Sequence, residues 1–178
     1  MQQKETKEKD RQKWLILLLL LITLAAVGIA IWALRMADSD RPLPPDFAPD
    51  DEAYAQEIPN DSGEKNDAAE GGGKVSLTYS NEVVMDLSDG TASLLFANPK
   101  RSSHDVILQI TVRDTVVVQS GLLKAGTQVK TLELLPEAVD KLESGGYHGS
   151  FFVFCYDPIT GEQAVVNTEI PITVIVRN

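Results

Sequence analysis

The sequence of 178 residues predicts an all-β fold, an antiparallel β-sandwich of about seven strands, preceded by one transmembrane α-helix and a disordered linker. Two observations support this. After residue 75, apolar side chains alternate with polar ones in short runs, the period of half-buried strands. Before residue 75 lie an uncharged apolar run and a stretch rich in Pro, Gly and acidic residues. The predicted parts are a basic tail at 1–13, the helix at 14–35, the linker at 36–74 and the β-domain at 75–178.

The apolar run from Trp14 to Leu34 predicts a membrane span. At 1.5 Å per residue it measures about 30 Å, the thickness of a bilayer's hydrocarbon core. Trp14 and Trp32 fall at its ends, where indole rings favour the headgroup boundary, and Lys13 and Arg35 flank it. These four residues are the predicted membrane interface, and the lipid bilayer is the first predicted partner.

The basic residues before this run predict a cytoplasmic N-terminus and place the rest of the chain outside. A cleaved signal peptide is the alternative, but its apolar region is about 7–15 residues long and ends in small residues. Here the run is longer and ends in the bulky sequence Ala30–Arg35. An uncleaved signal anchor is therefore expected. The small residues Ala26, Ala30 and Ala33 share a helical face and add a weak prediction of a homodimer.

The segment 36–74 carries most of the formal net charge of −10. This acidic balance argues against nucleic-acid binding, because it repels phosphate backbones. The segment has scattered apolar residues and many prolines, so we expect it to be a disordered spacer. A short docking motif formed by Phe47, Tyr54 and Ile58 is the alternative.

Seven runs with strand character follow. Turn sequences such as Asp89-Gly90 separate them, and the segment from Asp157 to Gly161 is typical of a hairpin connection. The predicted strands are Val75–Tyr79, Ala92–Phe96, Val106–Val112, Thr115–Val118, Val129–Leu134, Tyr147–Tyr156 and Ile170–Val176.

The run Tyr147–Tyr156 is apolar on both faces, which is typical of a central strand covered on both sides. A covering loop, or the segment Pro136–Glu143, explains the second face without any binding function. The alternative is an exposed patch that binds a partner. A short strand at a sheet edge is a second candidate surface. The candidate interaction residues are Phe152, Phe154 and Tyr156 on the first surface and Val116, Val117 and Val118 on the second.

Leu142 and Tyr147, before the long apolar strand, resemble the corner of immunoglobulin and fibronectin type III domains. The resemblance implies an immunoglobulin-like architecture in which the leucine packs inward and the tyrosine hydroxyl bonds back across the turn. The Cys–Trp–Cys core of immunoglobulin domains is missing. The stretches SGLLKAGTQVKTLEL and LESGGYHGSFFVFCYDPITGE also resemble anchored surface proteins of Gram-positive bacteria, which implies the cytoplasmic membrane of such a bacterium as the location.

Residues that carry chemistry are few. Ser103, His104 and Asp105 are consecutive, and neighbours on a strand point to opposite faces, so no catalytic triad is expected. His148 is expected to be exposed, and Cys155, the single cysteine, to be an inert core thiol. We therefore predict no enzyme activity, no metal and no cofactor.

The sequence predicts a membrane-anchored, non-enzymatic interaction module, an accessory subunit of a membrane or cell-envelope assembly with a protein partner. Two alternatives stay open. Aromatic side chains on one sheet face favour a cell-wall or carbohydrate-binding domain if they are exposed. If neither candidate surface is exposed, a structural spacer is favoured.

Overall fold

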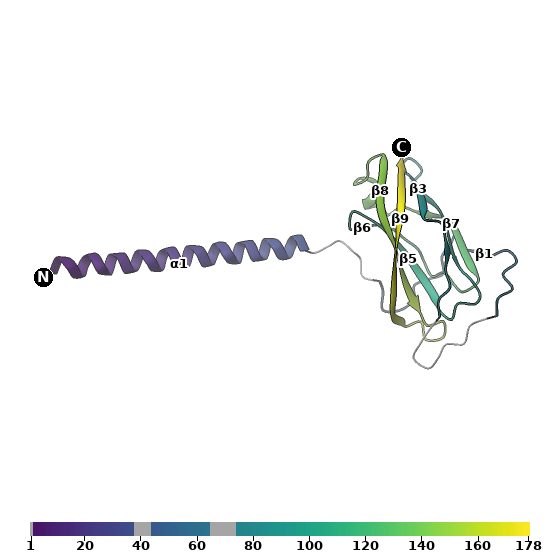
Figure 1. The fold of residues 1–178 in the computed structure, drawn as a ribbon, viewed down its shortest axis with the longest axis horizontal. Coiled ribbons are helices and arrows are strands. Elements are labelled where there is room, and N and C mark those ends of the chain that lie inside the picture. Colours follow the sequence, from purple (N-terminus) through teal and green to yellow (C-terminus); the bar gives the residue numbers. More distant parts are fainter. Residues whose placement is uncertain (1, 38–43, 65–73) are drawn as a thin grey trace. The chain divides into compact units, whose positions relative to one another are not determined.

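The computed structural model describes residues 2–37, 44–64 and 74–178. The chain divides into two compact units, Met1–Ser39 and Asp40–Asn178. The first unit contains helix α1, and the second is a β-rich domain (Figure 1).

Helix α1 extends from Gln2 to Ala37, and its side chains are described continuously from Lys13 to Ile29. Among the described residues, no helix is both long enough and apolar enough to cross a membrane. On this finding the predicted transmembrane helix at 14–35 is wrong, and so is the predicted single-pass location in a bacterial cytoplasmic membrane.

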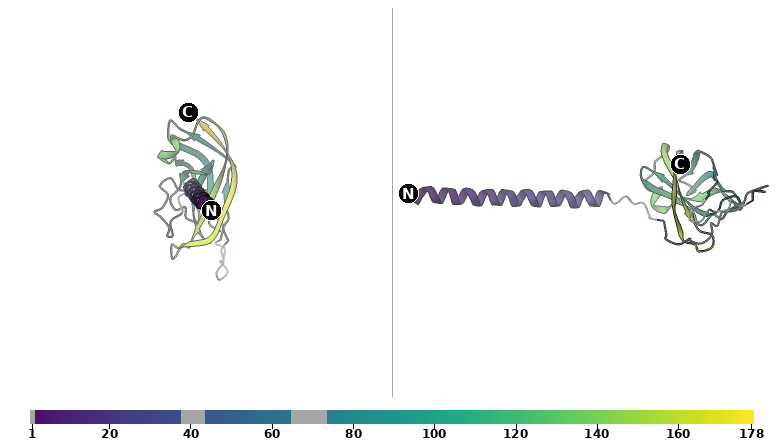
Figure 2. Two further views of the ribbon diagram at one scale, coloured as in Figure 1. Left: turned by 90° about the vertical axis from the view of Figure 1, so that its left-hand side faces the viewer. Right: turned by 60° about the horizontal axis from the view of Figure 1, so that its bottom comes forward.

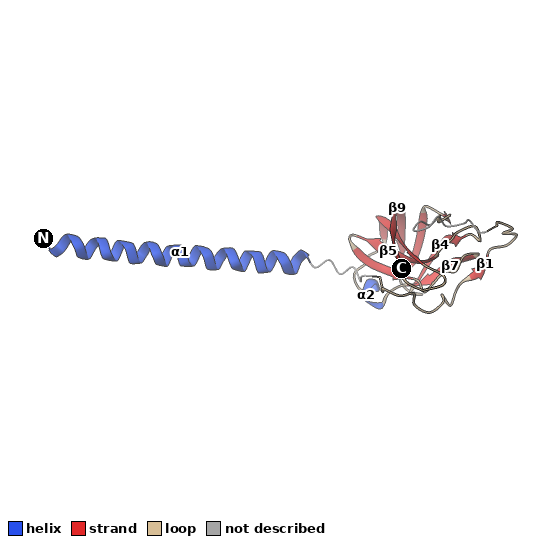
Figure 3. Ribbon diagram, turned by 90° about the horizontal axis from the view of Figure 1, so that it is seen from below, coloured by secondary structure: helices blue, strands red, loops and turns tan. Residues whose placement is uncertain are grey.

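In the described residues of the second unit, 44–64 and 74–178, there are nine strands and one short helix, α2 (Figure 3). Their bounds are β1 Gln56–Glu57, β2 Thr78–Tyr79, β3 Glu82–Asp86, β4 Thr91–Asn98, β5 Asp105–Val112, β6 Thr115–Gln119, β7 Thr127–Glu133, α2 Pro136–Val139, β8 Gly145–Tyr156 and β9 Gln163–Arg177.

The strands form one curled sheet, a half-barrel, in the order β1-β7-β4-β3-β9-β8-β5-β6, with β2 also paired to β4. Figure 2 shows the curl in the curved ribbon of β9, drawn in yellow. The predicted antiparallel sandwich of about seven strands is wrong in two respects, because the sheet is continuous and because one of its pairs is parallel.

Strand β3 is responsible for both differences. It pairs antiparallel with β4 through Val84–Asp86 and parallel with β9 through Glu82–Asp86. Because both of its edges are used, β3 joins the half of the sheet that contains β4 and β7 to the half that contains β8 and β5. No strand was predicted at these residues.

The main core lies inside the curl of the sheet. Alternate residues of the strands fill it, as the period-two pattern predicts, and Phe96 of β4 meets Phe151 of β8 edge to face at 5.7 Å between ring centroids. Val153 and Cys155 of β8 lie in the same cluster. Phe154 and Tyr156 belong to a second, smaller cluster on the opposite face of β8. The predicted division of this strand into two apolar faces is confirmed.

Residues 44–64, called the strap from here on, lie against the sheet. Strand β1 of the strap pairs with β7, and isolated bridges join Phe47 to Glu162 and Asp51 to Leu122. The predicted disordered linker at 36–74 is therefore wrong for residues 44–64, whose backbone hydrogen bonds are made with the domain. Residues 38–43 and 65–73 lie outside the described part.

Two contacts expected from the resemblance to immunoglobulin domains are present. Leu142 is buried, and the Tyr147 hydroxyl donates a hydrogen bond to the Glu143 carbonyl at 2.8 Å. Leu142 follows α2, whose Ala138 carbonyl accepts from the Leu142 N–H. These contacts fix the corner before β8, while the family assignment itself stays a prediction.

Candidate functional site

The aromatic residues of β8 do not form an exposed patch. Tyr156 is fully buried and Phe154 is 7 % exposed, while Phe152 is half-buried beside them. They pack against Ile107 of β5 and against Leu122. The surface that sequence analysis assigned to Phe152, Phe154 and Tyr156 is therefore covered.

The strap supplies this cover. Ala48 packs against the small cluster, and its N–H donates to the Gly161 carbonyl at 2.7 Å. The Tyr156 hydroxyl donates to the Pro45 carbonyl at 2.8 Å, and the Gln163 N–H to the Asp46 carbonyl at 3.0 Å. A covering segment was one of the expected explanations for the second apolar face, but it comes from the supposed linker and not from Pro136–Glu143.

The second candidate surface, Val116–Val118, is also buried. Strand β6 ends the sheet, yet its outer edge is engaged: the Leu135 N–H donates to the Val117 carbonyl at 2.8 Å, and Val118 forms a bridge with Leu134. The three valine side chains are at most 5 % exposed. These side chains lie where the curled sheet closes, and they do not form an exposed strand edge.

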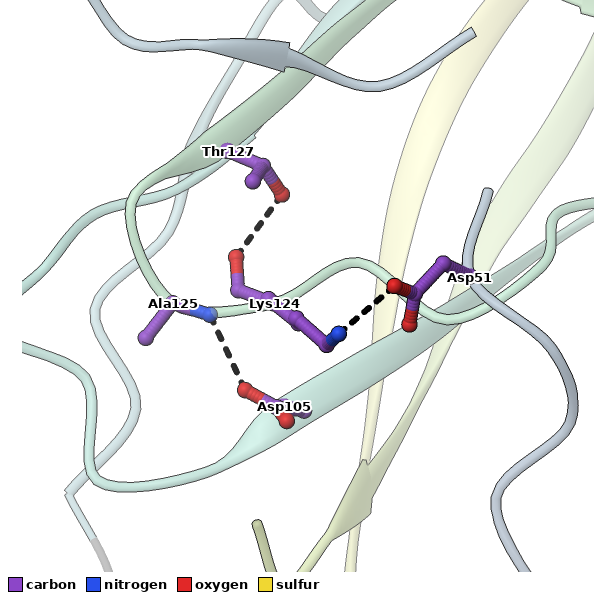
Figure 4. Close-up of polar contacts among 5 residues, drawn as sticks. All are labelled: Asp51, Asp105, Lys124, Ala125 and Thr127. Atoms are coloured by element: carbon purple, nitrogen blue, oxygen red, sulfur yellow. Dashed lines mark hydrogen bonds and ion pairs between the residues drawn. The ribbon is translucent and has the colours of Figure 1, made fainter. Parts of the chain in front are cut away.

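Charged groups fasten the middle of the strap. Asp51 accepts a 2.6 Å ion pair from Lys124, and the Glu52 carboxylate accepts the Gly121 N–H at 2.6 Å. Figure 4 shows Lys124 reaching Asp51 while Asp105 of β5 accepts the Ala125 N–H at 2.9 Å. The hydrogen bond with Asp51, and its charge, raise the pKa of Lys124.

Two further contacts fasten the rest of the strap. The Tyr54 hydroxyl donates to Glu133 at 2.5 Å, and this hydrogen bond raises the pKa of Tyr54. The Asp61 carboxylate accepts the Lys100 N–H at 2.7 Å, which lowers the pKa of Asp61. Of the strap residues in these contacts only Tyr54 was singled out from the sequence, as part of a docking motif with Phe47 and Ile58. The strap contacts themselves were not predicted, because the partners of Asp51, Glu52, Tyr54 and Asp61 lie 39 to 79 positions away.

The residues suspected of chemistry have structural partners. The Ser103 hydroxyl contacts His104 Nδ1 at 2.8 Å, and it also binds the backbone of Lys74. Cys155 is buried, and burial raises its pKa to about 11, which keeps the thiol protonated. Over the residues with described positions, no group of three or more His, Cys, Asp or Glu side chains is placed to hold a metal ion.

The described residues of the domain line several open hollows on its surface. One of about 410 Å³ lies between Ile58–Gly63 of the strap and β4, and one of about 490 Å³ is lined by Asp50–Tyr54 and β7. A third, of about 450 Å³, is lined by His148, Glu169 and the β5–β6 turn at Arg113–Asp114. Both turn residues have positive φ, and Arg113 stacks over the Tyr147 ring at 4.7 Å from its centroid.

The predicted membrane-interface residues belong to α1. Trp14 is 71 % exposed and Lys13 is exposed. The side chains of Trp32 and Arg35 lie outside the described residues, as do those of Ala30 and Ala33 from the predicted dimer face.

Comparison with protein families and with curated proteins finds no family model and no curated protein that this chain matches.

Proposed function

We propose that this chain is a non-enzymatic interaction module that works as a subunit of a larger assembly, with α1 as its docking helix. The observation that carries the proposal is the exposure of α1. From Trp14 to Ile29 its large apolar side chains are between 46 % and 71 % exposed. An apolar surface of this extent is unstable in water, so another apolar surface must cover it.

The stretch of α1 from Trp14 to Ile29 is apolar on opposite faces, which strengthens the argument. Leu17, Leu20 and Leu24 share one face, and Leu15, Leu19 and Ile22 share another, and all are exposed. An amphipathic helix would bury one face against its own domain and leave a polar face in water. A helix that is apolar all round is buried by its partners instead.

The non-enzymatic part of the proposal rests on the contacts of the reactive groups. The Cys155 thiol is buried and held neutral, and the Ser103 hydroxyl ties Lys74 to the domain. A nucleophile needs a base and access to substrate. Both groups serve the fold.

A structural spacer is the second candidate function, because both predicted interaction surfaces of the domain are buried. The carbohydrate-binding alternative loses its support for the same reason, since sugar-stacking needs exposed rings and Tyr156 is fully buried.

The proposal is tested by cross-linking the full-length chain in its native cells, purifying it and identifying the recovered proteins by mass spectrometry. Two matched variants replace one face each with glutamine: Leu17/Leu20/Leu24 and Leu15/Leu19/Ile22. A protein partner seated on α1 is recovered reproducibly with the parent chain, and one of the two variants loses it at least about tenfold more than the other.

Recovery of the chain alone would overturn the proposal and leave the spacer. The proposal would also be overturned if the purified chain floats with protein-free phosphatidylcholine–phosphatidylglycerol vesicles and the cross-linking experiment recovers no partner protein.

A further inference from the structure

We propose that the outer edge of β9, between Gln163 and Thr173, binds a short, extended, basic peptide of a partner protein as an added strand. This inference rests on the proposed interaction role, which it extends from α1 to the β-domain. The site is formed by backbone groups of β9 and by the side chain of Glu169, and it does not involve α1.

The direction of the backbone groups is set by two hydrogen bonds. The Gln163 N–H donates to Asp46 at 3.0 Å and the Thr173 N–H to Asn81 at 2.8 Å, and neither acceptor belongs to β8. The pairing of β8 with β9 is regular from Asn167 to Val176, and a register shift separates this stretch from Gln163. In a regular strand every second N–H points to the same side, so the direction is counted back from Thr173. The N–H groups of Asn167 and Glu169 therefore also point away from β8.

The stretch between these two hydrogen bonds is open. β8 pairs with β9 along one side, as in the register of Phe151 with Ile170. On the other side, β3 pairs only with Thr173–Arg177, and the strap reaches as far as the hydrogen bond donated by the Gln163 N–H. Within 44–64 and 74–178, no other strand pairs with β9. About 25 Å of strand edge is thus available.

The length of this opening selects the occupant. The strap at Asp46 closes one end, and β3 at Asn81 closes the other. A second copy of β9, which has 15 residues and is about 50 Å long, would run into both. A flexible peptide that pairs over about five residues and then turns away fits between them, as in strand addition to other sheet edges.

Charge selects a basic peptide. Glu169, Glu162 and Asp46 along this edge are exposed, and the whole chain has a formal net charge of −10. A lysine or arginine directly opposite Glu169 makes a favourable cross-strand pair. Glu169 and Pro171 also line one side of the hollow of about 450 Å³, whose other lining residues, Arg113 among them, belong to β5, β8 and the β5–β6 turn.

Pro171 explains why this edge does not pair indiscriminately. Its backbone nitrogen lies on the same outward side of β9 as those of Asn167 and Glu169. Because proline has no N–H, Pro171 ends the row of hydrogen-bond donors. Pro171 also shows that a proline at an outward-facing position of β9 removes no hydrogen bond between β9 and β8. Asn167→Pro is therefore a variant that removes one outward N–H and leaves the sheet intact.

The test uses the full chain, kept in a mild nonionic detergent because α1 is apolar, and a fluorescein-labelled peptide of sequence Thr-Lys-Val-Lys-Val-Lys-Thr. The control peptide is N-methylated at its five central residues, so it keeps the charges and loses the backbone donors. Binding is followed by fluorescence anisotropy. Asn167→Pro is compared with Asn167→Ala, and Glu169→Lys with Glu169→Gln, after circular dichroism has confirmed that each variant folds.

We expect the parent peptide to bind and the N-methylated one to bind at least about tenfold more weakly. Asn167→Pro weakens binding about tenfold and Asn167→Ala less than about twofold, since the proline loses a hydrogen bond and the register. Glu169→Lys weakens binding more than Glu169→Gln. Amide hydrogen exchange at Asn167 and Glu169 slows when the peptide binds.

No binding of the parent peptide at millimolar concentration, equal binding of the N-methylated peptide, or unchanged binding by Asn167→Pro would each overturn the inference. None of these outcomes affects recovery of a protein partner through α1, so the two proposals fail separately.

Discussion

The Tyr156 hydroxyl donates a 2.8 Å hydrogen bond to the carbonyl oxygen of Pro45, which lies 111 positions earlier in the chain. This contact joins the end of β8 to the start of the strap. It places residues that the composition assigns to a flexible tether over an apolar face of the domain. The strap is therefore part of the fold, and the predictions below address how it is held.

Replacing Tyr156 with phenylalanine removes this hydrogen bond and keeps the buried ring. Pro45 is exposed, so its carbonyl regains water, and we expect a loss of about 1 kcal/mol in the free energy of unfolding. Urea unfolding measures the loss, and hydrogen exchange of the Ala48 amide should speed up with it. An unchanged midpoint with unchanged exchange at Ala48 would contradict the role assigned to this bond.

Gly121 is a close-packed point beneath the strap. A Cβ atom there would lie 2.9 Å from the Asp50 carbonyl oxygen and 2.9 Å from the Glu52 Cα. Gly121→Ala therefore displaces the strap at a cost of about 1–3 kcal/mol. Limited proteolysis should cut residues 44–64 of this variant faster than those of the parent chain. Gly63→Ala, whose Cβ meets ordinary contacts at 3.4 Å or more, is the control and should be cut at the parental rate.

Gly149 marks the closest approach of β8 to its neighbours. A Cβ atom at this position would lie 2.6 Å from the Thr111 carbonyl oxygen and 3.0 Å from a methyl group of Val174. Gly149→Ala should lower the free energy of unfolding by about 1–3 kcal/mol, because both neighbours are held in the sheet. Gly146→Ala on the same strand meets nothing within 4 Å and should change it by less than about 0.5 kcal/mol. Equal urea midpoints for the two variants would refute the packing argument.

Stability should fall in acid, partly through Asp61. The Lys100 N–H lowers the folded-state pKa of Asp61 below the ordinary value of 3.8. A carboxyl group with a lowered folded-state pKa stabilises the fold at pH values above its unfolded pKa and ceases to do so as the pH falls through the folded value. The urea concentration at the midpoint of unfolding of the parent chain should therefore be nearly constant around pH 6 and should decrease below about pH 4.

Asp61→Asn is the matched variant for this measurement. It keeps an oxygen acceptor for the Lys100 N–H and removes the titration. Its midpoint should be lower than that of the parent chain at pH 6, and the gap should narrow toward pH 3. A gap that stays constant across this range would show that Asp61 does not contribute to the acid dependence. Hydrogen bonds also lower the pKa values of Asp86 and Asp157, so both carboxyl groups contribute to the decline in the same direction.

Cys155 should resist alkylation in the folded chain. Burial raises its pKa to about 11, and only the thiolate reacts with iodoacetamide. At pH 8 we expect the reaction to be at least about a hundredfold slower than in the same chain unfolded in urea, as measured by mass spectrometry. Equal rates would mean that the main-core face of β8, where Cys155 lies with Phe151 and Val153, is open in solution.

Local patterns predicted much of the β-domain. Alternation located β4 to β8 within a few residues and the C-terminal half of β9, whose first seven residues were missed, and the run Tyr147–Tyr156 was correctly divided into two apolar faces. The hairpin at Asp157–Gly161 is also as predicted, with Gly161 at a φ of +71° and the Asp157 carboxylate accepting two turn N–H groups. Strand β3 was missed although Val83 and Met85 alternate with Glu82 and Val84, a signal of the same kind that was available in the sequence.

Local sequence patterns could not predict how the strands join into one curled sheet. The pairing of β3 with β9 joins residues about 90 positions apart, and no periodicity specifies which edges meet. The two candidate surfaces were misjudged for the same reason. The exposure of Val116–Val118 depends on where Leu134 and Leu135 lie in the folded chain. The exposure of Tyr156 depends in the same way on the position of Pro45.

The sequence by itself determined the period-two strands, the two-faced apolar character of β8 and the scarcity of reactive groups, because alternation and composition are local properties. The tertiary structure alone decided that the sheet is continuous, that the strap covers the aromatic face, and that β9 keeps an open edge between Gln163 and Thr173. Long-range contacts decide these features, and their free energy comes from surfaces that meet only after the chain has folded.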